Sequence, residues 1–110
     1  MRTIHKFVLN AETRNILTLP RLSDILSAAE QRGEIVLYVQ LDTGELEKEK
    51  VEIFVFGTGH NIDAMPEDSS QFVGTVKLLD GSLMFHVFAN WDIEEELGDT
   101  ETDELVEDDE

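Results

Sequence analysis

The sequence contains no cysteine among its 110 residues, only two prolines, and no basic side chain after Lys77. The lack of cysteine excludes a disulfide framework, a thiolate nucleophile and a metal site built on sulfur ligands. No apolar run reaches the roughly 18 residues that a membrane span needs, and the N-terminus lacks the basic and apolar regions of a signal peptide. We therefore expect a cytoplasmic protein with one compact domain and no membrane contact.

The charge is strongly negative and unevenly distributed. The chain has 25 acidic and eight basic side chains, which gives a formal net charge of −17. Residues 1–91 contain 13 acids and all eight bases, whereas residues 92–110 contain 12 acids and no base. Because such a polyanion repels phosphate groups, we expect neither nucleic acid nor an anionic membrane as a direct partner.

Residues 92–110, the acidic tail, contain too few apolar side chains to offset the entropy of ordering. We therefore divide the chain into a β domain over residues 1–91 and a flexible, disordered tail over residues 92–110. The tail either binds a partner or is a solvated segment that only aids solubility. The candidate partner-binding residues are Trp91, Asp92, Glu94, Glu95, Glu96, Asp99, Glu101, Asp103, Glu104, Glu107, Asp108, Asp109 and Glu110.

The body consists of short segments rich in β-branched and aromatic residues, separated by turn residues. Arg32-Gly33 and Asp80-Gly81 predict hairpin turns, and Gly74 predicts a bulge. The charged residues 45–50 are typical of a solvated hairpin tip. The predicted strands cover residues 3–9, 16–19, 25–31, 34–41, 50–56, 71–79 and 82–89. This pattern predicts an all-β fold, either a small antiparallel β-sandwich or a partly open barrel.

Residues 22–31 allow two interpretations. Their apolar residues have helical spacing, and Ser23 could cap a helix. However, a tight turn and a strand follow directly, which favours a hairpin with residues 34–41. We expect a strand, with an α+β fold containing one short helix near residues 22–31 as the alternative.

Several short motifs of the body occur in a characteristic order: IHKF at residues 4–7, GTGH at residues 57–60 and FHVF at residues 85–88. In this order and spacing the chain resembles a family of small, uncharacterised phage and prophage proteins. The resemblance implies a phage-derived protein that works in the cytoplasm of the host cell, and it implies no activity or cofactor. The long acidic tail departs from the family, whose members tend to end soon after FHVF.

Three histidines, His5, His60 and His86, lie inside these motifs and are candidate metal ligands. Three imidazoles and a water molecule form one arrangement of catalytic zinc. No two of them have the spacing of a chelating pair, so tertiary structure would have to bring them together. The alternative is that each is a hydrogen-bonded structural side chain and that His60 closes a glycine turn.

Gly57, Thr58, Gly59 and His60 follow a predicted strand, as phosphate-binding loops do, and are candidate ligand-binding residues. Ile62 occupies the position at which a dinucleotide fingerprint requires glycine. The alternative is a turn in which the glycines supply a positive φ or allow close backbone approach.

These observations favour a non-enzymatic accessory protein of phage type that needs no cofactor. Its acidic tail would engage a host protein with a basic, nucleic-acid-binding surface. One alternative is a β module that binds a small ligand or a metal through the GTGH loop and the histidines. A further alternative is a virion structural or assembly protein.

Overall fold

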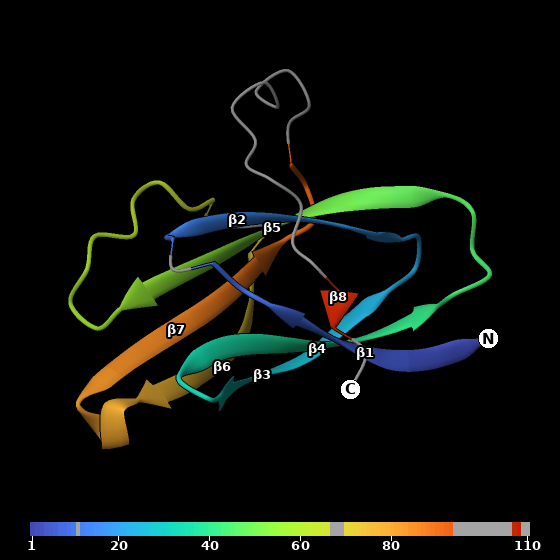
Figure 1. Ribbon diagram of the computed structural model, residues 1–110. Helices are drawn as coiled ribbons and strands as arrows, with labels where there is room; N and C mark the ends of the chain where they lie inside the picture. The colour runs from blue at the N-terminus through green and yellow to red at the C-terminus, as the bar shows by residue number, and fades with distance from the viewer. Residues whose placement is uncertain (11, 67–69, 94–106, 109–110) are drawn as a thin grey trace.

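The computed structural model describes residues 1–10, 12–66, 70–93 and 107–108. Within these residues, eight strands form two antiparallel sheets (Figure 1). One sheet has the order β3-β4-β1-β8 and the other β2-β5-β7-β6. The strands are β1 (Arg2–Val8), β2 (Arg14–Pro20), β3 (Asp24–Gln31), β4 (Glu34–Asp42), β5 (Lys48–Gly57), β6 (Ser70–Leu78), β7 (Leu83–Asn90) and β8 (Glu107–Asp108).

The all-β prediction is confirmed, and each predicted strand agrees with an observed strand to within two residues at either end. Residues 24–31 form strand β3, not a helix, because β4 pairs with them through a two-residue turn. Arg32 and Gly33 in this turn have φ values of 55° and 83°, as a type I′ hairpin turn requires. The described residues include no helix with the length and apolar character of a membrane span.

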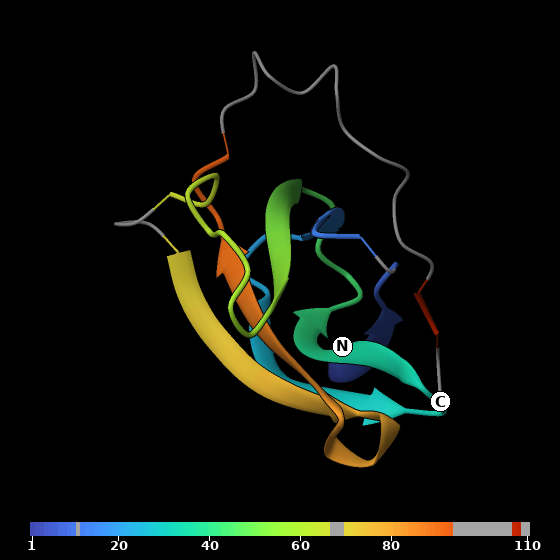
Figure 2. The ribbon, with the colours of Figure 1, turned by 90° about the vertical axis from the view of Figure 1, so that its left-hand side faces the viewer.

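The two sheets approach one another along one side, where their edge strands β3 and β6 lie next to each other (Figure 2). A Cβ atom on Gly74 of β6 would lie 3.8 Å from the backbone nitrogen of Ala28 in β3. A bulge between Phe72 and Gly74, as predicted, and another between Ile25 and Ser27 interrupt the register of these edges. Because bulges bend strands, the sheets curve toward each other into a partly open barrel.

The core lies between the sheets, on the faces that alternation along the strands turns inward. Leu37 and Val39 of β4 face Ile53 of β5 and Val87 of β7, and all four are fully buried. Trp91, just after β7, packs against the same cluster. Burying one such aliphatic side chain contributes about 1.5–3 kcal/mol relative to its exposure.

The outer face of the second sheet carries a cluster of aromatic rings. Phe54 stacks on Phe56 with ring centroids 5.9 Å apart, and Phe88 lies 6.4 Å from Phe56 and 5.4 Å from Phe72. Phe54 and Phe56 are buried, whereas Phe72 is 56% exposed. Strand β5 therefore buries side chains on both of its faces, which explains why its residues 53–56 are all apolar.

The predicted hairpin tip over residues 45–50 is wrong. Strands β4 and β5 belong to different sheets, so residues 43–47 connect the two sheets. Lys48, Glu49 and Lys50 pair with β2, opposite Pro20, Leu19 and Thr18. Charged side chains suit an exposed strand end as well as a loop, so composition could not separate the two cases. The second predicted hairpin forms, but its turn contains four residues, since Leu78 pairs with Leu83.

An ion pair lies at the end of the barrel where β4 ends. The Met1 ammonium group donates a hydrogen bond to Asp42 Oδ1 at 2.8 Å, and the Gly44 N–H donates to the same oxygen at 3.0 Å. Both hydrogen bonds, the ammonium first, lower the pKa of Asp42 below its ordinary value. The pKa of Asp42 is therefore lower in the folded protein than in the unfolded chain. Its ion pair stabilises the fold above about pH 4, and this contribution is lost as the pH falls further.

The substitution Gly33→Ala is expected to lower the free energy of unfolding by about 1–2 kcal/mol, because a left-handed φ strains any residue with a Cβ atom. Gly44→Ala is the control, since Gly44 has no left-handed φ and a Cβ there would meet its nearest atom at 3.5 Å. Its expected change is near zero or slightly stabilising. Urea unfolding followed by Trp91 fluorescence measures the free energy of unfolding of both variants. Equal decreases in the two would contradict the assignment of a type I′ turn at Arg32-Gly33.

Candidate functional site

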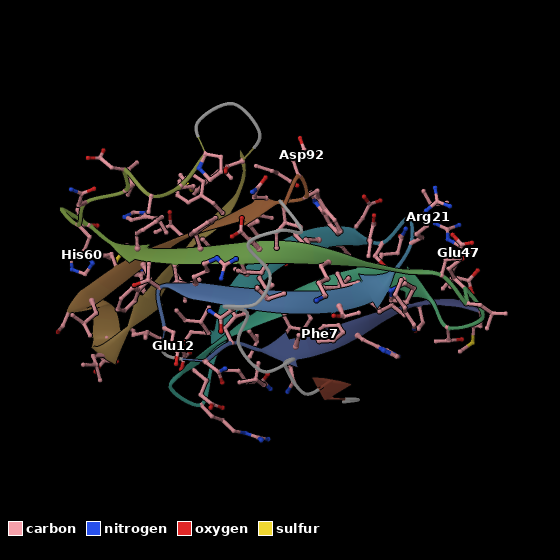
Figure 3. All side chains as sticks on the ribbon, turned by 90° about the horizontal axis from the view of Figure 1, so that it is seen from above. Phe7, Glu12, Arg21, Glu47, His60 and Asp92 are labelled. Atoms are coloured by element: carbon pink, nitrogen blue, oxygen red, sulfur yellow. The ribbon has the colours of Figure 1, made fainter. Side chains whose placement is uncertain are left out.

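The structure does not bring the three histidines together at one site. His5 lies in β1 of the first sheet, opposite Val39, whereas His86 lies in β7 of the second sheet, opposite Phe56. His60 follows β5 at the end of the molecule opposite to Arg21 and Glu47 (Figure 3). Across the described part of the chain, no three His, Cys, Asp or Glu side chains form a group that could hold a metal. The metal-binding prediction therefore gains no support.

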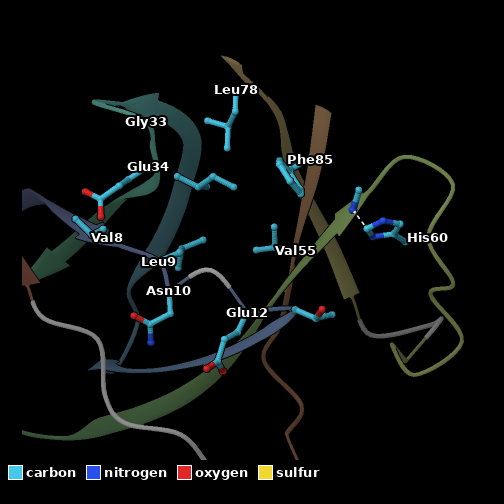
Figure 4. Close-up of a pocket in the computed structure, with 13 residues that line it drawn as sticks. Val8, Leu9, Asn10, Glu12, Gly33, Glu34, Val55, His60, Leu78 and Phe85 are labelled. Atoms are coloured by element: carbon cyan, nitrogen blue, oxygen red, sulfur yellow. Dashed lines mark hydrogen bonds between the residues drawn. The ribbon is translucent and has the colours of Figure 1, made fainter. Parts of the chain in front are cut away.

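Residues 57–60 form a tight turn, the GTGH turn, which His60 closes. The His60 N–H donates to the Gly57 carbonyl at 3.0 Å, and the Gly57 N–H donates to His60 Nδ1 at 3.2 Å (Figure 4). Gly59 has a φ of +90°, and a Cβ atom on Gly57 would lie 2.8 Å from His60 Cε1. The glycines thus have the two roles expected of a structural turn. Gly59 adopts a left-handed conformation, and Gly57 allows the His60 ring to approach the backbone closely.

Both ring nitrogens of His86 are hydrogen-bonded. Thr58 Oγ1 lies 2.7 Å from His86 Nε2, and Thr75 Oγ1 lies 3.0 Å from His86 Nδ1. In a neutral imidazole one nitrogen donates and the other accepts, and a hydroxyl group can take either role. His86 therefore joins three segments, namely β7, β6 and the GTGH turn, and any metal would have to displace one of these bonds.

A cavity of about 390 Å³, the end cavity, opens where β1, β5 and β6 end (Figure 4). Its volume lies in the range of small-molecule sites, about 300–1,000 Å³. Its apolar lining consists of Val8, Leu9, Ile35, Val55, Leu78 and Phe85. Its other lining residues are Asn10, Glu12, Thr13, Gly33, Glu34, Gly57 and His60. No lysine or arginine lines it within the described ranges, so its ionisable groups are two carboxyls and one imidazole.

The described residues of the β1–β2 link (9, 10, 12 and 13) form one wall of the end cavity, and the link is attached to both sheets. The Leu9 N–H donates to the Ile35 carbonyl of β4 at 2.9 Å. The Val55 N–H of β5 donates to the Thr13 carbonyl at 2.8 Å. These two bonds hold the link across the open side of the barrel, between the sheets that it connects.

Asn15 fixes the same link from inside the protein. Its side chain is 1% exposed, its Oδ1 accepts from the Asn10 N–H at 3.1 Å, and its Nδ2 donates to the Glu12 carbonyl at 3.2 Å. Asn15 was not among the predicted site residues. Its burial could have been predicted, because alternation in β2 places Asn15 on the same inward face as Leu17 and Leu19.

A second buried polar group, also missed, lies on the outer face of the second sheet. Glu52 is 8% exposed and accepts hydrogen bonds from Arg14 Nε and from Asn90 Nδ2, the latter at 2.7 Å. The carboxylate therefore connects β2, β5 and β7 and has a partner for each oxygen, as a buried charge requires.

Part of the predicted partner-binding set lies within the described residues. Trp91 is partly buried, and Asp92 is exposed with its N–H bonded to Asn90 Oδ1 at 3.1 Å. Glu107 and Asp108 form β8 opposite Phe7 and Lys6 of β1, a pairing that the sequence did not indicate. The other predicted residues lie outside the described residues: Glu94, Glu95, Glu96, Asp99, Glu101, Asp103, Glu104, Asp109 and Glu110.

These features define an all-β protein, an antiparallel sandwich closed along one side into a partly open barrel with a cavity at one end. The family model of a domain of unknown function (DUF7352) matches residues 1–98, and the chain belongs to this family. The match includes β1 to β7 and ends within the acidic tail, and the family description names no activity. Comparison with curated proteins and with solved structures gave no match.

Asn15→Leu is expected to lower the free energy of unfolding by about 1–3 kcal/mol, because it leaves the Asn10 N–H and the Glu12 carbonyl without their partner. Asn10→Ala, at an exposed side chain of the same link, is the control and should change stability by less than about 0.5 kcal/mol. Urea unfolding measures both. If Asn15→Leu is as stable as the parent protein, the link does not depend on this side chain.

Gly57→Ala is expected to displace the His60 ring and to destabilise the GTGH turn. In a His60→Ala background the same substitution should have little effect, because the ring that it meets is gone. A double-mutant cycle by urea unfolding should therefore give a coupling energy of about 0.5–3 kcal/mol. Strictly additive effects would show that the contact does not hold the turn.

Proposed function

We propose that this protein is a non-catalytic accessory protein of phage type that binds a host macromolecule through its acidic tail. The partner is a protein with a basic surface that normally holds nucleic acid. The observation that carries the proposal is the distribution of charge, since residues 92–110 contain 12 acids and no base. Such a segment is attracted to any surface that presents closely spaced lysines and arginines.

Some basic side chains of the body already have acidic partners within the body. Arg14 is paired with the buried Glu52. Arg21 Nη1 lies 3.4 Å from Glu47 Oε1. Groups that are paired within the body are less able to neutralise the tail, which supports a role for the tail toward another molecule.

The described ends of the acidic tail are attached to the body. Trp91 packs against the core at the end of β7, and β8 pairs with β1 in the other sheet. A partner that binds the tail would therefore also lie near the surface of the folded domain.

The spacing of the charges supports a basic groove as the partner surface. Twelve acids over 19 residues, fully extended at about 3.4 Å per residue, give about one charge every 5 Å. A single strand of nucleic acid carries one about every 3.4 Å. The tail therefore carries its negative charges less densely than a single strand of nucleic acid, but along a comparable extended chain. Such a chain could compete for a site that binds nucleic acid.

Replacing Glu94, Asp99, Glu101 and Asp103 by their amides should weaken capture of such a partner. The captured protein would come from a nuclease-treated bacterial lysate and be identified by mass spectrometry. The dissociation constant of the purified pair should rise about fivefold or more, because exposed ion pairs contribute about 0.2–1 kcal/mol each. The affinity of the parent protein should fall as salt is raised, since salt screens exposed charges.

The matched control removes four negative charges from the exposed surface of the body, by amide substitution of Asp24, Glu30, Asp63 and Asp80. This control should bind nearly as tightly as the parent protein. Equal losses in the two variants would assign binding to net charge alone. An unchanged affinity in the tail variant would remove the tail from the interaction.

A further inference from the structure

We propose that the end cavity is a binding site for a small amphipathic cation, a molecule with an apolar body and one ammonium group. This inference is independent of the acidic tail, because the cavity is built entirely by residues 8–85. Three features carry it: an apolar interior, an acidic rim without a basic residue in the lining, and walls held by hydrogen bonds.

The apolar interior is assembled from separate parts of the fold. The side chains of Leu9, Val55, Leu78 and Phe85 point toward one common space (Figure 4). They come from the β1–β2 link, β5, β6 and β7, and Val8 of β1 and Ile35 of β4 complete the set. A ligand that fills this space gains by removing its own apolar surface and theirs from water.

The rim determines the charge that the ligand should carry. Glu12 and Glu34 are exposed and belong to the lining, Glu12 in the β1–β2 link and Glu34 at the start of β4 (Figure 4). An ammonium group near the mouth would be attracted to both, whereas a carboxylate in the same place would be repelled.

The neighbourhood of the mouth preserves this preference. Glu30 and Asp80 line an adjoining hollow together with Lys77. The adjacent hairpin turn adds Arg32, which is exposed. The positive charges of Lys77 and Arg32 balance the negative charges of Glu30 and Asp80. The two carboxylates of the cavity lining are therefore not offset by these neighbours.

The walls of the cavity are fixed without a ligand. Asn15 and two backbone hydrogen bonds hold the β1–β2 link, and His60 holds the GTGH turn against Gly57. Gly33 lies in the type I′ turn that forms a third side. A preformed site binds without first ordering its own loops, which favours affinity for a small molecule.

The test uses three probes of the same size and shape that differ in charge: 4-phenylbutylamine, 4-phenylbutan-1-ol and 4-phenylbutyrate. Each is titrated into the full chain at neutral pH and followed by NMR of the amides of Leu9, Ile35, Val55 and Phe85. The expected order of affinity is amine, alcohol, carboxylate. The amine should bind about fivefold or more tightly than the carboxylate, as two exposed carboxylates allow.

Substituted proteins separate the two parts of the site. The double variant Glu12→Gln, Glu34→Gln should make the amine bind no more tightly than the alcohol, while alcohol affinity stays unchanged. The matched double variant Asp24→Asn, Asp63→Asn removes the same charge away from the cavity and should keep the preference for the amine. Val55→Phe should fill the interior and weaken all three probes about tenfold, because the lost contacts are apolar.

Three outcomes would overturn the proposal, and all of them can be observed without Val55→Phe, the variant most at risk of misfolding. The first is no binding of any probe up to millimolar concentration. The second is a carboxylate that binds as tightly as the amine. The third is amide shifts that map outside the end cavity.

Discussion

The β1–β2 link holds the two sheets at the open side of the barrel, and the end cavity depends on it. Strands β3 and β6 bring the opposite edges of the sheets together. On the open side, two backbone hydrogen bonds attach the link to β4 and β5, and the buried Asn15 fixes its conformation. A buried amide is stable only when its partners are present, so the same bonds that satisfy Asn15 also determine the shape of the cavity wall.

Polar groups within the body are largely engaged with one another. Glu52 pairs with Arg14 and Asn90, and the ring nitrogens of His86 bond to two threonine hydroxyls. These bonds give polar side chains structural roles in the body. The chain as a whole carries an excess of negative charge. Both proposals follow from this sign, because a negative potential attracts basic proteins and small organic cations alike.

The strands could be predicted from the sequence because alternation and β-branched residues are local features. The GTGH turn and the Gly74 bulge were also recognisable, since glycine marks positions that other residues fill badly. Residues 45–50 were misassigned as a hairpin tip because exposed strand ends and loops have the same composition. Glu52 was missed because its burial depends on what covers the outer face of its sheet, which a single strand does not reveal.

The sequence by itself determined the all-β class, the approximate strand boundaries, the tight turns and the division of charge between residues 1–91 and 92–110. Each of these depends on neighbours within a few residues of one another. Only the tertiary structure decided which strands share a sheet, that His5 and His86 lie in different sheets, and that residues from five strands and three connecting segments surround one cavity. Such arrangements depend on contacts between residues far apart in the chain, and the period of two along each strand carries no information about them.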